Sequence, residues 1–123
     1  MKFHLQTPAG HNLFTGHGAG YVAINGARYA KSLLVTPERL VEDWPASNFE
    51  HLSAQHFEGL LALKPQIVLL GTGATLRFPR PELTRCLHTA QIGLEVMDNA
   101  AVCRTYNILT AEGRNVVAAV LLG

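Results

Sequence analysis

The segment from residue 98 to residue 122 constrains the fold more than any other part of this chain. Asp98 is a good helix N-cap, and Gly113 supplies the left-handed residue that ends many helices. The following run, Asn115 to Leu122, lacks polar alternation, so it predicts a central strand covered on both faces. Helical spacing between the two caps predicts an inward stripe of Ala101, Val102, Thr105, Tyr106 and Leu109, with Arg104 and Asn107 on the other side.

A hairpin-rich start precedes this segment. Residues 1–18 predict an edge strand and irregular loop. Asn25-Gly26 lies between two β-prone runs and predicts a type I′ hairpin turn, because both residues tolerate positive φ. Further strands are expected over residues 33–36, 66–70 and 92–97, and a loop with one helical turn over residues 38–52.

Two more helices are expected between these strands. Ser53 caps the first, which presents Phe57, Leu60 and Leu61 on one face and ends at Pro65. The second helix begins at Pro81-Glu82 and is expected to bury a stripe of Leu83, Cys86, Leu87 and Ala90. The alternation of strands and helices predicts one α/β domain, residues 1–123, with a mixed sheet.

Composition and charge exclude several classes of protein. The chain has 123 residues, of which 48% are apolar and 15% charged, a balance typical of one globular domain. The formal net charge of +1 argues against an electrostatic nucleic-acid binder. Without a signal-peptide pattern or an apolar run of membrane-spanning length, we expect a cytoplasmic protein with no membrane span. Cys86 and Cys103 lack the CxxC spacing and are expected to be buried free thiols.

The first candidate site is the loop after the strand at residues 66–70. Its small residues would let backbone N–H groups approach an anion. A dinucleotide fingerprint fails, because Leu76 occupies the place of the third glycine and the next helix begins too late. In the alternative, the glycines only permit a tight turn, and Arg104 pairs with Asp98 or Glu95. The broader hypothesis is a pocket for a small anion or small molecule at Gly71, Thr72, Gly73, Arg77, Arg80 and Arg104.

The remaining titratable residues show no catalytic or metal-binding spacing. Cys103 beside Arg104 is a candidate for a thiol of lowered pKa, but nothing in the spacing brings His88, the nearest base, against it. His51 and His56 lie five residues apart and miss a common helical face, so hydrogen-bonding or exposed histidines are expected. We predict no catalytic residue, no metal and no cofactor.

The second candidate site is a partner-binding surface at Trp44, Pro45 and Phe49. Aromatic anchors on a loop concentrate binding energy when they dock into a pocket. In the alternative, Trp44, the single tryptophan of the chain, folds back as a lid on the sheet.

Several short blocks, in this order, resemble a known family. The blocks are Asn25-Gly26 with Tyr29, Ser32 and Pro37, then Trp44-Pro45, Leu70-Gly71-Thr72-Gly73, Pro81-Glu82-Leu83, Glu95-Val96-Met97-Asp98, Cys103-Arg104-Thr105-Tyr106-Asn107 and Glu112-Gly113-Arg114. On these residues the chain resembles the domain-of-unknown-function family that includes mitochondrial respiratory complex I assembly factor 3. The resemblance implies a three-layer α/β fold with a packed N-terminal β-hairpin sub-sheet and about three helices.

Two hypotheses about function follow. The resemblance favours a non-catalytic, assembly-factor-like binding module with a protein partner, as in respiratory-complex assembly. The alternative is a small-anion or small-molecule binding protein, or an enzyme, with its pocket at the Gly71–Gly73 loop. The sequence leaves open whether the chain forms a homo-oligomer.

Overall fold

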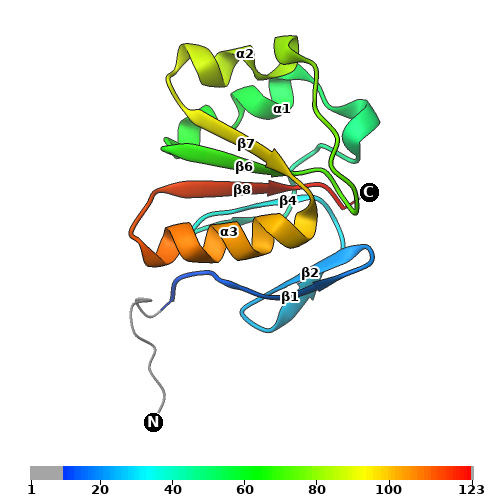
Figure 1. The fold of residues 1–123 in the computed structure, drawn as a ribbon, viewed down its shortest axis with the longest axis vertical. Coiled ribbons are helices and arrows are strands. Elements are labelled where there is room, and N and C mark those ends of the chain that lie inside the picture. The colour runs from blue at the N-terminus through cyan, green and yellow to red at the C-terminus, as the bar shows by residue number, and fades with distance from the viewer. Residues whose placement is uncertain (1–9, 123) are drawn as a thin grey trace.

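The computed structural model describes residues 10–122, so the expected features of residues 1–9 lie outside it. The strands are β1 Phe14–Gly18, β2 Tyr21–Ile24, β3 Ala27–Tyr29, β4 Leu33–Val35, β5 Leu40–Val41, β6 Ile67–Gly71, β7 Gly93–Met97 and β8 Val116–Val120. Five of them form a mixed sheet in the order β5-β4-β8-β6-β7 (Figure 1). The other three form an antiparallel sub-sheet in the order β1-β2-β3, with β1 at one edge.

The helices lie on both faces of the five-stranded sheet. They are α1 Ala54–Glu58, α2 Pro81–Thr89 and α3 Asn99–Ala111, with short 3-10 turns at Phe49–His51 and Leu61–Leu63. Helix α3 covers one face, and α1 and α2 cover the other (Figure 1). This architecture confirms the predicted fold class. Among residues 10–122, none of the helices is both long enough and apolar enough to cross a membrane.

Strand β8 lies at the centre of the sheet and is buried along its whole length. It pairs antiparallel with β4 and parallel with β6. Its alternate residues serve two cores, because successive side chains of a strand point to opposite faces. Val116, Ala118 and Val120 belong to the core under α3, and Val117 and Ala119 to the core under α1 and α2. The predicted central strand is therefore confirmed.

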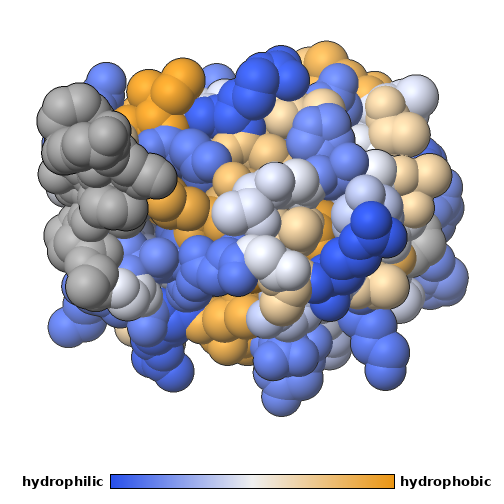
Figure 2. All heavy atoms as spheres, turned by 90° about the horizontal axis from the view of Figure 1, so that it is seen from below, coloured by the Kyte–Doolittle hydropathy of each residue, from blue (hydrophilic) through white to orange (hydrophobic). Residues whose placement is uncertain are grey.

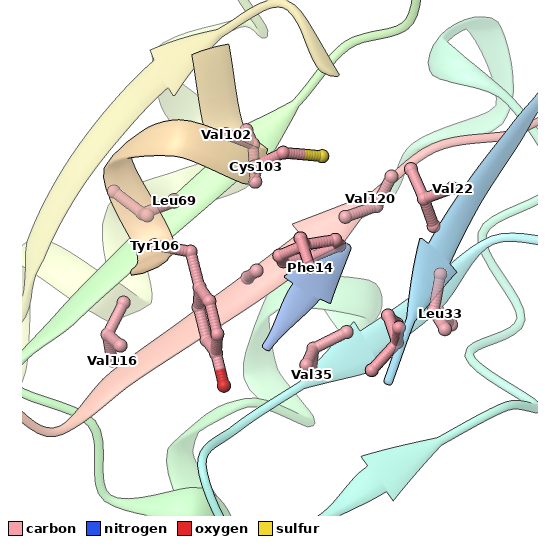
Figure 3. Packing of buried hydrophobic residues seen from close by; sticks show 12 residues of the cluster. Phe14, Val22, Leu33, Val35, Leu69, Val102, Cys103, Tyr106, Val116 and Val120 are labelled. Atoms are coloured by element: carbon pink, nitrogen blue, oxygen red, sulfur yellow. The ribbon is translucent and has the colours of Figure 1, made fainter. Parts of the chain in front are cut away.

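Helix α3 begins and ends where the sequence predicts. The Asp98 Oδ1 atom accepts a hydrogen bond from Ala101 N at 2.8 Å, and Gly113 has a φ of +80°. The predicted inward stripe is partly wrong, because the helix packs on the sub-sheet as well as on the five-stranded sheet (Figure 3). The buried residues are Val102, Cys103, Tyr106 and Thr110, whereas Ala101, Thr105 and Leu109 are only partly buried.

The prediction that Asn107 lies on the outer side of α3 is wrong. Phe14 N donates to Asn107 Oδ1 at 3.0 Å, and Asn107 Nδ2 donates to Phe14 O at 2.8 Å. The amide of Asn107 thus occupies the place that a neighbouring strand would take beside β1. Sequence spacing could not show this contact, since the two residues are 93 positions apart.

The remaining elements confirm most of the expected order. Asn25 and Gly26 have φ values of 52° and 88° in the β2–β3 hairpin turn. Helix α1 is shorter than predicted, because Gly59 caps it and a separate 3-10 turn follows. Helix α2 begins at Pro81 as predicted, but Thr84 joins Leu87 as a buried residue while Ala90 is exposed, since α2 packs against both α1 and β7.

Candidate functional site

A groove beside the loop that follows β6 joins residues from both candidate sites. It lies between the 3-10 turn Phe49–His51 and the segment 77–83, and its volume is about 270 Å³. Phe49 comes from the expected partner surface, whereas Arg77 and Arg80 come from the expected ligand pocket. We call it the Phe49–Arg80 groove; its principal lining residues are Phe49, Glu50, Arg77, Phe78, Arg80 and Leu83.

Two contacts hold Arg77 in this groove. Its Nη2 atom donates to Glu50 Oε2 at 2.6 Å, and its guanidinium carbon lies 4.2 Å from the centre of the Phe49 ring. The hydrogen bond from Arg77 holds the pKa of the Glu50 carboxyl below its ordinary value, which favours the carboxylate form. Because both side chains are exposed to solvent, the pair orders the groove more than it stabilises the fold.

The loop beside this pair exposes large apolar side chains. Phe78 is 72% exposed and Leu76 is 50% exposed. Contiguous exposed apolar patches are typical of interaction surfaces, and Phe78 lies at the rim of the Phe49–Arg80 groove. Phe78 was not among the candidate residues predicted from the sequence. The stretch Arg77-Phe78-Pro79-Arg80-Pro81 contained the signal, because a phenylalanine among prolines cannot take part in a helix interior or a central strand.

The Gly71-Thr72-Gly73 turn uses its own donors inside the protein. Thr72 N donates to Met97 O at 3.0 Å, and Gly73 N donates to Asn99 Oδ1 at 3.1 Å. Asn99 Nδ2 in turn donates to Leu121 O at 2.9 Å. A side chain at Gly71 would collide with Asn99, so this glycine permits the close approach of α3. Asn99, which the sequence analysis did not single out, therefore holds the loop.

A larger cavity, of about 510 Å³, lies next to Gly73 beyond the carboxyl ends of β6 and β8. His17, Gly20, Asp98 and Leu122 are among its lining residues. Parallel sheets often bind ligands at this position. However, Arg77 and Arg80 line the groove instead, and Arg104 is exposed on α3 and lines neither space. The six residues of the expected ligand pocket are thus not brought together.

Arg104 also lacks the alternative partners considered for it. Within residues 10–122, the salt bridge present is Arg77–Glu50, and Arg104 pairs with neither Asp98 nor Glu95. Its guanidinium is therefore open to solvent on the outer side of α3, as the helical spacing predicted.

Trp44 folds back into the core. It is 7% exposed, and its indole Nε1 donates to His56 O at 3.2 Å. Its ring packs edge-on against the imidazole of His56, with the ring centres 6.1 Å apart. Pro45 is exposed and Phe49 is half-buried in the groove. The three residues of the expected partner surface are therefore divided between the core and the surface.

The two cysteines are free thiols, Cys86 partly buried and Cys103 buried. Burial raises the pKa of the Cys103 thiol to about 11, outweighing the lowering by Arg104. Burial also raises the pKa of Cys86. Both therefore stay protonated at neutral pH, which is the opposite of an activated nucleophile. In the part of the chain that the structure describes, no group of three or more His, Cys, Asp or Glu side chains is arranged to hold a metal ion.

The face on the sub-sheet side differs from the groove. Figure 2 shows this face, seen from below in the orientation of Figure 1, as small apolar patches separated by hydrophilic side chains. Scattered apolar residues of this kind are normal on a protein surface. Phe78 and Leu76, which flank Arg77 in the chain, are two of the three large apolar side chains exposed among residues 10–122; the third is Ile108.

This chain is similar in sequence to a family of unknown function and to several known proteins. A family model described as "protein of unknown function (DUF498/DUF598)" matches residues 14–121. NADH dehydrogenase (ubiquinone) 1 alpha subcomplex assembly factor 3 of Bos taurus is 30% identical over 104 residues, covering 83% of this chain and 55% of that protein. The 13 kDa major membrane protein of Francisella tularensis subsp. holarctica is 27% identical over 104 residues, covering 84% and 85%.

A solved structure shows the same fold. The crystal structure of a Bordetella parapertussis protein superposes with a TM-score of 0.87 at 37% identity, covering 94% of this chain and 100% of that one. The chain spans about half the length of the bovine assembly factor, so similarity to that protein concerns one part of it.

Proposed function

Because the chain belongs to the DUF498/DUF598 family of proteins of unknown function, we propose that it is a non-catalytic, assembly-factor-like module that binds another protein. The similarity to an assembly factor supports this function, at 30% identity over most of this chain. Action in respiratory-complex assembly is the finer form of the proposal. The cytoplasmic location expected from the sequence stays a prediction.

One observation carries the proposal: Phe78 stands 72% exposed at the rim of the Phe49–Arg80 groove. An aromatic side chain in this position can enter a pocket of a partner, and Arg77 is already oriented by Glu50 and Phe49. Little side-chain entropy is then lost when Arg77 meets a partner.

The ligand-binding alternative has weaker support. The 510 Å³ cavity next to Gly73 favours it, since its size suits a small molecule. Against it, the N–H groups of Thr72 and Gly73 are already hydrogen-bonded within the protein. An anion there would have to replace these bonds, and no arginine lines the cavity.

Affinity capture from the native host tests the proposal. Full-length wild type is compared with Phe78→Ala and with a matched control, Ile108→Ala, which changes a 58% exposed apolar residue of α3. We expect one specific protein to be lost with Phe78→Ala and kept with the control. The loss of affinity should be about thirty-fold or more, because an aromatic anchor contributes about 2 kcal/mol or more.

A reciprocal affinity capture, with the identified protein as bait, checks the result. If no captured protein depends on Phe78, the proposed surface is wrong. If inorganic phosphate instead raises the melting temperature of wild type but not of His17→Ala, which changes a residue lining the 510 Å³ cavity, the ligand-binding function replaces the proposal.

A further inference from the structure

The five-stranded sheet has one long open edge. Within residues 10–122, β7 pairs with β6 on one side and with no strand on the other. The opposite edge of the sheet is β5, which has two residues, whereas β7 has five. A strand edge of this length is a template for pairing with another chain unless something prevents it.

The hydrogen bonds of β7 define which backbone groups are open. Gly93 N donates to Gln66 O at 3.1 Å, and Thr72 N donates to Met97 O at 3.0 Å. With Leu69 opposite Glu95, this parallel register directs the N–H and C=O groups of residues 93, 95 and 97 toward β6. The N–H and C=O groups of Leu94 and Val96 consequently point away from the sheet.

The side chains of β7 differ on its two faces. Leu94 and Val96 pack against the core under α1 and α2. Glu95, midway between them, is exposed on the other face, where α3 packs on β6 and β8. Among the described residues Glu95 takes part in no ion pair. The centre of the open edge therefore carries a single unpaired negative charge.

We infer that the β7 edge is a docking site for an extended segment of another protein that places Lys or Arg opposite Glu95. Such a segment pairs antiparallel with β7 and bonds to the open backbone groups of Leu94 and Val96. Its residues on either side of the basic one lie on the same face as Leu94 and Val96 and are apolar. This site is distinct from the Phe49–Arg80 groove and rests on separate observations.

Charge disfavours a second copy of the chain paired about Glu95. Two β7 strands paired antiparallel about Glu95 would set Leu94 of one against Val96 of the other. Glu95 would then face Glu95 directly, and like charges directly opposite each other in a sheet are destabilising. The same geometry favours a strand with the opposite charge at its centre.

A charge-reversal experiment with peptides tests the inference. The probes are two labelled peptides, Thr-Val-Thr-Val-Lys-Val-Thr-Val-Thr and the same sequence with Glu in place of Lys. Fluorescence anisotropy measures their affinity for full-length wild type and for Glu95→Lys. We expect wild type to prefer the Lys peptide at least five-fold, and Glu95→Lys to reverse the preference.

Two further variants locate the binding. Glu38→Lys changes an exposed glutamate in the β4–β5 turn, at the other end of the sheet, and should leave the preference of wild type intact. Val96→Pro removes a donor that points away from β6, and should weaken the binding of the Lys peptide at least ten-fold. Equal affinity of wild type for both peptides, or a preference that Glu95→Lys does not change, would overturn the inference even if Val96→Pro fails to fold.

Discussion

At the scale of single residues, burial of Cys103 outweighs the charge of the neighbouring Arg104 in setting the pKa of the thiol. Cys103 follows α3's first turn and precedes Arg104, an arrangement that in an exposed helix would favour the thiolate. The side chain instead points toward the strands of the core and is 5% exposed (Figure 3). Desolvation then dominates, and the pKa of the thiol is raised to about 11.

This pKa predicts a loss of stability in alkali. Above pH 9 the thiol of the unfolded chain ionises while the buried one does not, so unfolding is favoured as the pH rises toward 11. The loss from this group should reach about 2 to 3 kcal/mol. Urea unfolding of wild type and Cys103→Ala at pH 8 and pH 10.5 measures it. The variant should lose less stability between the two pH values, and parallel losses would contradict the prediction.

At the scale of elements, His56 makes the hydrogen bonds that hold the first turn of α1 and attach the helix to Trp44. This helix has five residues, too few to be stable alone. Ser53 N donates to His56 Nδ1 at 3.1 Å, which closes the first turn, and Trp44 Nε1 donates to His56 O. Burial lowers the pKa of His56, so the ring stays neutral and can accept the hydrogen bond.

Acid should therefore weaken α1. The folded pKa of His56 lies below its unfolded value, so its contribution is present above about pH 6.5 and lost as the pH falls through the folded pKa. His56→Gln is the matched variant, because glutamine can keep the capping contact without titrating. Between pH 7.5 and pH 5, wild type should lose more stability than the variant, as measured by urea unfolding followed through Trp44 fluorescence. An equal loss in both proteins would count against this role.

At the scale of the whole molecule, α3 joins the two sheets. Its inner residues pack on β6 and β8, while Asn107 binds both backbone groups of Phe14. Tyr106 adds a hydrogen bond from its hydroxyl to Asn12 O at 3.0 Å and an edge-on ring contact with Phe14. The sub-sheet is therefore attached to the domain largely through one turn of this helix.

Removing the Asn107 amide should loosen the sub-sheet selectively. Asn107→Ala leaves the backbone groups of Phe14 without partners and should cost about 2 kcal/mol. Hydrogen exchange should accelerate more for amides of β1 and β2 than for those of β6 and β8. Ile108→Ala, one residue away and exposed, should leave the pattern unchanged. A uniform acceleration across both sheets would show that Asn107 does not couple them in this way.

Much of the fold was predictable because its signals are local. Asp98 and Gly113 mark the ends of α3, Asn25-Gly26 marks the β2–β3 turn, and an apolar run marks β8. Where neighbours in space decide burial, prediction failed in detail. The contact between Asn107 and Phe14 and the exposure of Ala90 both depend on which element packs beside the helix.

The candidate site was predictable only in pieces. By itself, the sequence determined the order of the elements through local spacing, and it indicated the family through the resemblance of several short motifs. It also picked out Phe49, Arg77 and Arg80 individually, by residue type and position. The tertiary structure alone decided that Arg77 meets Glu50 and Phe49, 27 and 28 positions away, and that Trp44 lies in the core. It also placed Arg104 on the exposed side of α3, outside the groove that Arg77 and Arg80 line. The physical reason is that contacts between distant residues depend on how whole elements pack, and periodicity along the chain does not record that packing.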